Sequence, residues 1–200
     1  PRLMEAHHGL GQVLSDQQLW EQAAECYAKA LALAPESADT HYGAGNAYVA
    51  IGDWRRALKH FHRAIALRPA HEKARWALVM AQLPAVPDAE TDPAERRRAF
   101  GRELDAFEHW IARGEHPEAW RVVGAQMPFY LAYQETPNRD LLARYGALCA
   151  RLMAPWQRAQ APAPRARPDR GPVRVGIVSA HFINHAVWTG IVRRDRKSVV

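Results

Sequence analysis

Apolar residues recur at helical spacing along most of the chain, and part of this pattern repeats itself. Shifting the sequence by 34 residues brings like residues together. The pairs are Gly11 and Gly45, Trp20 and Trp54, Ala23 and Ala57, Tyr27 and Phe61, Ala30 and Ala64, Leu31 and Ile65, Leu33 and Leu67, and Pro35 and Pro69. A fixed period of this kind predicts stacked helix pairs, each burying an apolar face on its neighbour.

Each kind of paired residue suits a particular place in such a stack. The glycines let the two helices of a repeat approach closely, the alanines fill the small space opposite, and the aromatic residues pack between repeats. Pro35 and Pro69 end the second helix, because proline cannot continue a helix and disfavours helix in the residue before it. Gly52 and Asp53 fit the turn within a repeat, with a glycine ending one helix and an aspartate capping the next.

This set of residues resembles the tetratricopeptide repeat. It predicts repeats at 1–35 and 36–69 and a capping helix at 72–83, which together form a mainly α solenoid over 1–83. About three repeats are needed for stability. We therefore expect further repeats before Pro1, in a longer protein. Amphipathic helices that share a register by coincidence are the alternative.

The inner helices of the predicted repeats line a concave face, where an extended peptide is expected to bind. Gln12 and Asn46 carry amides that both donate and accept hydrogen bonds, as a peptide backbone requires. Tyr42 is the third candidate for contact with an acceptor protein. The alternative for each residue is a solvated polar face. The same face carries Glu5, His8 and Asp39.

A second helical region is predicted at 93–154. Asp92 and Pro93 mark its start, with an N-cap followed by proline at the first helical position. Gly114 ends the first helix. The apolar residues of that helix, at helical spacing, are Phe100, Leu104, Phe107 and Ile111.

Three further segments are expected within this region. A short helix from Pro117 brings Trp120 and Val123 to the core. Residues 127–134 are apolar and aromatic and are predicted to be extended or loop-like. A last helix starts near Asn138, and its apolar stripe is Leu141, Leu142, Tyr145, Leu148, Leu152 and Met153.

The character of the chain changes after this region. Residues 155–172 are rich in proline and arginine and are predicted to form a linker. The run Val173–Ser179 is rich in β-branched residues and predicts a buried parallel strand. A polar loop and the start of a helix follow, as in the first half of a βαβ unit, where ligands bind at the carboxyl end of the strand.

The stretch Val175–His185 resembles the opening strand and loop of the catalytic domain of protein O-linked N-acetylglucosaminyltransferases, including bacterial SPINDLY-type relatives. Pro128–Gln134 and Leu142–Gly146 resemble the segment between repeats and catalysis in the bacterial proteins. The resemblance implies two Rossmann-like lobes that move N-acetylglucosamine from UDP-GlcNAc to serine or threonine of acceptor proteins, with inversion and without a metal. Residues 173–194 would then begin the truncated catalytic domain.

His185 matches the histidine that ends the family's loop motif near the reacting centre. As a neutral imidazole it would orient the acceptor or take a proton; the alternative is a histidine that rigidifies the loop. Many relatives have aspartate where this chain has His181, which puts any role of that carboxylate in doubt. The lobe that grips UDP is absent, so we expect no cofactor bound by these residues and no turnover by this chain alone.

Two other functions compete with this interpretation. The chain is a non-catalytic tetratricopeptide adaptor in one of them, and the predicted strand is incidental. In the other, a transferase of the same fold acts on a non-protein acceptor, such as a glycan or a lipid-linked sugar. The residues do not identify the acceptors or decide the oligomeric state.

The composition limits the kinds of partner that we expect. The net charge of +6 comes almost entirely from arginine, since lysine occurs only at Lys29, Lys59, Lys73 and Lys197. Scattered arginine indicates a coding bias more than a nucleic-acid surface. The two cysteines lie in apolar helical patterns, which suits free thiols in a reducing compartment. No signal peptide or membrane-length apolar run is found, so we expect a cytoplasmic protein without nucleic-acid or membrane partners.

Residues 195–200 break the pattern. The apolar spacing begun at Ala186 stops in a charged hexapeptide, Asp195–Val200. Back-translation as GAT CGG AAG AGC GTC GTG gives the start of a common sequencing adapter. We therefore expect this tail to be an assembly artefact, with a natural basic tail as the alternative.

Overall fold

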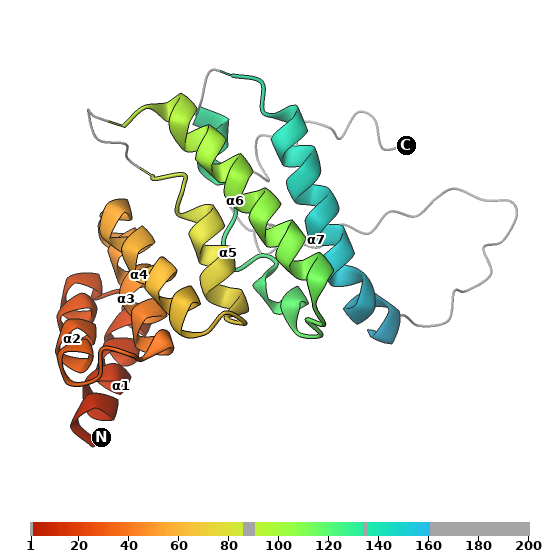
Figure 1. The fold of residues 1–200 in the computed structure, drawn as a ribbon. Coiled ribbons are helices and arrows are strands. Elements are labelled where there is room, and N and C mark those ends of the chain that lie inside the picture. The colour runs from red at the N-terminus through yellow and green to blue at the C-terminus, as the bar shows by residue number, and fades with distance from the viewer. Residues whose placement is uncertain (1, 86–90, 134–135, 161–200) are drawn as a thin grey trace, which may run out of the picture. The chain divides into compact units, whose positions relative to one another are not determined.

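The computed structural model describes residues 2–85, 91–133 and 136–160, and these residues are mainly helical (Figure 1). The elements are α1 Arg2–Asp16, α2 Trp20–Leu33, α3 Ala38–Ile51, α4 Trp54–Leu67, α5 Glu72–Met80, α6 Pro93–Arg113, the 3₁₀ helices η1 Ala119–Val122 and η2 Phe129–Tyr133, and α7 Arg139–Gln160. The predicted mainly α solenoid is confirmed. The strand at 173–179, the catalytic-domain start at 173–194 and the tail at 195–200 lie outside the described residues.

The first five helices stack in the order of the sequence. Helix α1 packs on α2 and α3 on α4, while α2 and α4 each pack on the helix that follows. Contacts also join α1 to α3 and α3 to α5, so these three helices form the inner row of the stack. This arrangement places the 34-residue equivalent positions of the three inner helices along one face.

The paired small and aromatic residues pack as predicted. The ring of Tyr27 lies between Gly11 of α1 and Gly43 of α3, and a Cβ added at Gly11 would lie 2.8 Å from Tyr27 Cε1. Gly45 faces Phe61 in the same way one repeat later. Both aromatic side chains are buried. The glycines are therefore required by the close approach of a ring.

The turn between α3 and α4 has the predicted chemistry. Gly52 adopts a left-handed conformation, with φ of 92°, and its N–H donates to the carbonyls of Tyr48 and Val49. Asp53 then caps α4, because its carboxylate accepts a hydrogen bond of 2.9 Å from the Arg56 backbone N–H. The carbonyls of Tyr48 and Val49 at the end of α3 and the N–H of Arg56 at the start of α4 thus gain partners.

Helix α5 differs from the prediction of a capping helix at 72–83. It begins at Glu72 as predicted but ends at Met80, and it packs on the following helices as well as on the repeats. Ala77 and Leu78 pack with Phe61 of α4, while Trp76 and Val79 belong to a larger cluster with α6 and α7. Because its apolar residues belong to both clusters, α5 joins the repeats to the following helices.

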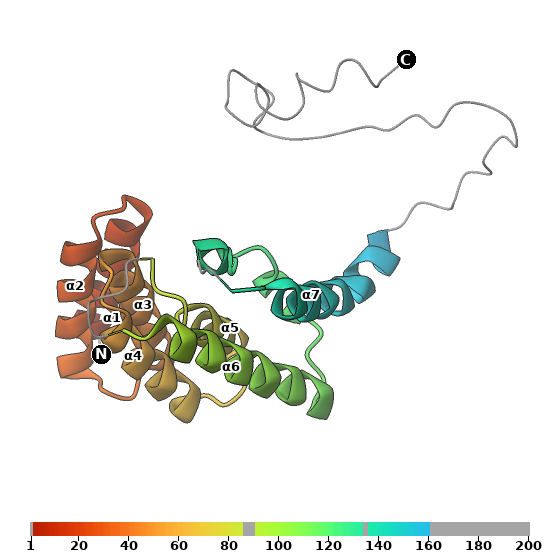
Figure 2. The ribbon, with the colours of Figure 1, turned by 90° about the horizontal axis from the view of Figure 1, so that it is seen from above.

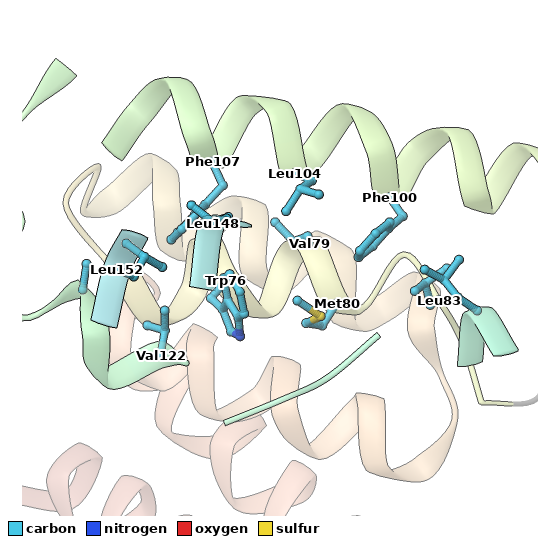
Figure 3. Close-up of a cluster of buried hydrophobic side chains, with 12 residues drawn as sticks. Trp76, Val79, Met80, Leu83, Phe100, Leu104, Phe107, Val122, Leu148 and Leu152 are labelled. Atoms are coloured by element: carbon cyan, nitrogen blue, oxygen red, sulfur yellow. The ribbon is translucent and has the colours of Figure 1, made fainter. Parts of the chain in front are cut away.

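This larger cluster is the main core beyond the repeats (Figure 3). The view shows side chains of α5 facing side chains of α6, with η1 and α7 beside them; the central ones are Trp76, Val79, Met80, Phe100, Leu104 and Phe107. In both ribbon views α5 lies between the repeats and α7 (Figure 1, Figure 2). The predicted start of α6 is confirmed, since Asp92 accepts from the Ala94 N–H at 2.9 Å.

The segment from Pro117 corrects the sequence analysis in detail. It forms only the single turn of η1, and Ala119 and Val122 are its buried residues. Val123 packs against the core as predicted, whereas Trp120 is half-buried and its ring lies 5.8 Å from that of Trp156. A 3₁₀ turn has three residues per turn, so Ala119 and Val122 share the face that contacts the core.

Residues 127–133 also differ from the predicted extended or loop-like segment. Phe129–Tyr133 form η2, with Leu131 fully buried. Phe129, Tyr130 and Tyr133 remain exposed and contact one another, at ring distances of 5.6–6.3 Å. Asn138 holds the turn, since its amide donates to the Leu131 carbonyl at 2.6 Å.

Helix α7 continues past the predicted linker boundary at Pro155. It ends at Gln160 and contains Pro155, so residues 155–160 belong to the helix and not to the linker. Proline removes one helical hydrogen bond, but the helix has packing contacts on both sides of Pro155: Leu152 is buried in the core and the ring of Trp156 lies against that of Trp120. The rest of the predicted linker, 161–172, lies outside the described residues.

Replacing Gly11 by alanine tests the close packing of the first repeat. The new Cβ meets a ring that Gly43 confines on its other side, so we expect the free energy of unfolding to fall by about 1–2 kcal/mol, the overpacking cost less the gain in helix propensity. Gly9→Ala is the control on the same helix, because a Cβ there has no neighbour within 4 Å among the described residues. Urea denaturation should show it unchanged or more stable; an equal loss in both variants would contradict the packing argument.

A second prediction concerns His60 on α4. Burial, together with the nearby His41 and Arg56, lowers the pKa of His60 from 6.5 to about 4. Between these pH values the unfolded chain binds a proton that the folded chain does not, so the stability of the repeats should fall as pH drops from 6.5 to 4.

The variant His60→Phe keeps a ring against Tyr48, whose ring stacks on that of His60 at 5.3 Å. Its melting temperature should fall less than that of the wild type over the same pH range. His62→Phe exchanges an exposed histidine of the same helix and should retain the wild-type slope. Equal slopes for the wild type and His60→Phe would show that His60 does not carry this pH dependence.

Candidate functional site

The inner helices line a groove with a volume of about 1140 Å³. Helices α1, α3 and α5 supply most of its wall. The other lining residues are Trp20 and Tyr27 of α2, His71 before α5, and Arg121, Val122, Ala125 and Gln126 at the end of η1 and after it. Drug-sized pockets measure roughly 300–1,000 Å³. A groove of this volume that runs across several repeats suits a chain more than a compact small molecule.

The three residues predicted to contact an acceptor protein all line this groove. Gln12 is exposed on α1, and Tyr42 and Asn46 are half-buried on α3. Tyr42 is held by its neighbours, with ring distances of 6.2 Å to Phe61 and 5.1 Å to His71. The repeat period therefore brings these side chains to one surface, and their role in binding stays a prediction.

The other polar residues of the predicted face divide. His8 and Asp39 line the groove, but both have partners within the protein. His8 Nδ1 lies 2.9 Å from the Thr40 hydroxyl, which is buried. Glu5 is exposed on α1 and is not among the groove-lining residues.

Asp39 forms the main charged contact of the groove. Arg68 of the C-cap of α4 donates two hydrogen bonds to its carboxylate, one of them 2.9 Å long. These bonds hold the pKa of Asp39 below its ordinary value. Asp39 is thus a positioned anion that ties α3 to the end of α4.

His71 lies beside this pair and is neutral near neutral pH. Burial, and the positive charge of Arg68, lower its pKa. Its Nδ1 accepts a hydrogen bond of 3.3 Å from the Ala74 N–H, so the ring proton is on Nε2. That atom lies 3.4 Å from Asp39 Oδ1 without meeting hydrogen-bond geometry. Because the ring is neutral, we describe this contact as dipolar and not as a salt bridge.

Sequence reasoning missed the end of the groove that α5 forms. Trp76 lines it, and Trp76 lies one period of 34 residues after Tyr42. Extending the repeat register by one unit would have placed it on the inner face. No comparable signal exists for Arg121 and Gln126, because they follow the repeats and reach the groove through the packing of η1 on α5.

The described residues contain no candidate metal site. Within 2–85, 91–133 and 136–160, no three histidine, cysteine, aspartate or glutamate side chains are placed to hold a metal ion. In the same ranges no helix has the length and hydropathy needed to cross a membrane. The predicted catalytic residue, His185, lies outside the described residues.

Comparison with known proteins agrees with this architecture. Residues 2–70 match the tetratricopeptide repeat family. These residues are tetratricopeptide repeats. A structure of MamA protein is similar over 82% of this chain and 79% of that chain, with 21% identity and a TM-score of 0.54, which shows a shared fold.

Two further structures are similar at lower TM-scores. An O-GlcNAc transferase mutant of Thermobaculum terrenum has 33% identity and a TM-score of 0.44, covering 55% of this chain and 19% of that chain. This chain thus spans about a fifth of that protein. The first tetratricopeptide domain of Spaghetti (RPAP3), bound to an HSP90 peptide, has 14% identity and a TM-score of 0.47, covering 62% and 93%. Among curated protein sequences, none matches this chain.

Proposed function

We propose that the groove binds an extended segment of an acceptor protein, and that the chain is part of a protein O-GlcNAc transferase of the bacterial SPINDLY type. The complete enzyme would move N-acetylglucosamine from UDP-GlcNAc to serine or threonine. The repeats would hold the acceptor, and the domain beginning near Val173 would carry the chemistry. The donor sugar would be bound by parts of the enzyme beyond this chain.

The observation that carries the binding half of the proposal is the groove itself. Amide side chains at Gln12 and Asn46 and the ring of Tyr42 share one wall. Asn46 Oδ1 is buried and has no hydrogen-bond partner in the described part of the chain, although buried polar atoms nearly always have one. An N–H of an extended peptide would supply that partner.

The catalytic half of the proposal is supported by sequence. Repeats, a helical region and the run Val175–His185 follow one another in the order typical of these transferases. His185 would orient the acceptor hydroxyl or accept its proton, since an imidazole titrates near neutrality. A purely structural histidine in the loop is the alternative that a variant can test.

Two other functions keep a place beside this one. A non-catalytic adaptor would use the same groove, because peptide binding by the repeats does not depend on a catalytic domain. A transferase of the same fold acting on a non-protein acceptor would keep the chemistry and use the repeats otherwise. The adaptor would transfer no sugar, and the other transferase would modify only a glycan or a lipid-linked sugar.

Peptide binding to the groove is the first test. The probe is a fluorescein-labelled ten-residue peptide with a central serine, selected by the wild-type chain from a random library. Asn46→Leu removes the amide with little change in size, and we expect binding about three- to tenfold weaker, as for one neutral hydrogen bond. Gln22→Leu, an exposed position on the outer helix α2, is the control. Peptide binding that Asn46→Leu leaves unchanged would exclude this contact.

Sugar transfer by the complete protein is the second test. Incubated with UDP-GlcNAc and acceptor proteins, it should modify serine or threonine, and His185→Ala should lower the rate by roughly 10²–10⁴-fold if the histidine acts as general base. Mass spectrometry of the acceptors measures the product. Transfer to a glycan or lipid-linked sugar alone would favour the non-protein acceptor, no transfer would favour the adaptor, and full activity of His185→Ala would remove the catalytic assignment.

A further inference from the structure

Four buried polar atoms of the groove have no hydrogen-bond partner among residues 2–85, 91–133 and 136–160. They are Asn46 Oδ1, His71 Nε2, Trp76 Nε1 and Gln126 Oε1. Leaving such an atom unpaired costs about 1–3 kcal/mol in general, and native proteins contain few of them. Of the unpartnered buried atoms in these residues, only His116 Nε2 lies outside the groove. This concentration on one surface points to a ligand.

The two atoms at the α5 end are a donor and an acceptor. The indole N–H of Trp76 can only donate, and Trp76 is 1% exposed. Figure 3 shows its nitrogen on the side of the ring that faces away from α6. Gln126, half-buried after η1, presents an amide oxygen that accepts. Both residues line the same groove, and Gln126 follows η1, the 3₁₀ helix that contacts α5.

We propose that Trp76 and Gln126 form a subsite for the backbone of a bound extended peptide. Trp76 Nε1 donates to a peptide carbonyl, and the Gln126 side-chain amide pairs with a peptide N–H. The subsite extends the proposed peptide groove beyond the repeats, onto the segment that follows η1, and it rests on the proposed function. Both side chains are uncharged, and both contact the peptide backbone. Recognition by this subsite therefore does not depend on the peptide's sequence.

The charges around this end do not favour an anion site instead. Lys73 and Arg121 also line the groove, but Arg121 pairs with Glu118 through its Nε. Lys73 is exposed, where a single charge contact contributes about 0–1 kcal/mol and is screened by salt. The buried neutral donor and acceptor, in contrast, match the two polar groups of a peptide unit.

Two variants of the full 200-residue chain test the subsite. Trp76→Phe removes the indole N–H and keeps an aromatic ring, and Gln126→Leu removes the amide at a position outside the tightly packed core. Each should lower the affinity for the selected ten-residue peptide about three- to tenfold. Trp120→Phe, an indole outside the groove, is the matched control. Thermal melting identifies any variant that has lost its fold, and Gln126→Leu keeps the test valid if Trp76→Phe does.

A backbone contact makes a sharper prediction than affinity alone. Replacing one peptide amide by an ester removes one N–H, and a scan of such esters should find a position that weakens binding to the wild type but not to Gln126→Leu. The loss should also be similar for two selected peptides of unrelated sequence. If Lys73→Gln and added salt weaken peptide binding while Trp76→Phe and Gln126→Leu have no effect, the site is an anion site and the proposal is overturned.

The outcomes separate this inference from the proposed function. If the wild-type chain selects no peptide, the proposed function fails and the subsite with it. If Asn46→Leu weakens peptide binding while both subsite variants bind the peptide as the wild type does, the proposed peptide binding is supported and the subsite assignment is wrong. Weakening by the subsite variants, with the ester effect lost in Gln126→Leu, supports both.

Discussion

Packing of helix α5 on two sides is the interaction on which the rest of the structure depends. One side of this nine-residue helix closes the hydrophobic stack of the repeats on Phe61. The other side places Trp76 against Phe107 and Tyr145, at ring distances of 5.3 and 5.8 Å. Because the two clusters share one short helix, α6 and α7 are fixed to the solenoid, and η1 is carried to the end of the groove.

The sequence predicts the repeats well because their packing is local and periodic. Gly11 and Gly45 each face an aromatic ring about half a repeat away, so one register determines Gly11, Tyr27 and their equivalents together. The later helices have no such period. Their boundaries follow contacts between distant residues, such as Trp120 with Trp156, and the expected linker start at Pro155 is wrong for that reason. From the sequence, α5 is predicted to cap the repeats, because its contacts with α6 are between residues distant in the sequence.

The groove shows the same division. Gln12, Tyr42 and Asn46 could be found from the sequence, because repetition places equivalent residues on one wall. The contributions of His71 and Gln126 could not, since a donor or acceptor is left unpaired only once the surrounding structure is complete. The pairing of Asp39 with Arg68 is likewise visible only in the structure, and it ties a residue of the predicted concave face to the end of α4. The geometry of the groove thus supports peptide binding, whereas the sequence of residues 175–185 supports catalysis.

The proposed peptide lies along the inner helices as far as Trp76. The indole N–H signal of Trp76 in a ¹⁵N-correlated NMR spectrum tests this most directly, because each of the seven tryptophans gives its own signal. On titration with the selected peptide, the Trp76 signal should move to the position of a hydrogen-bonded indole and exchange more slowly with water, while that of Trp120 stays. A bound peptide that leaves the Trp76 signal unmoved would show that the peptide does not reach Trp76.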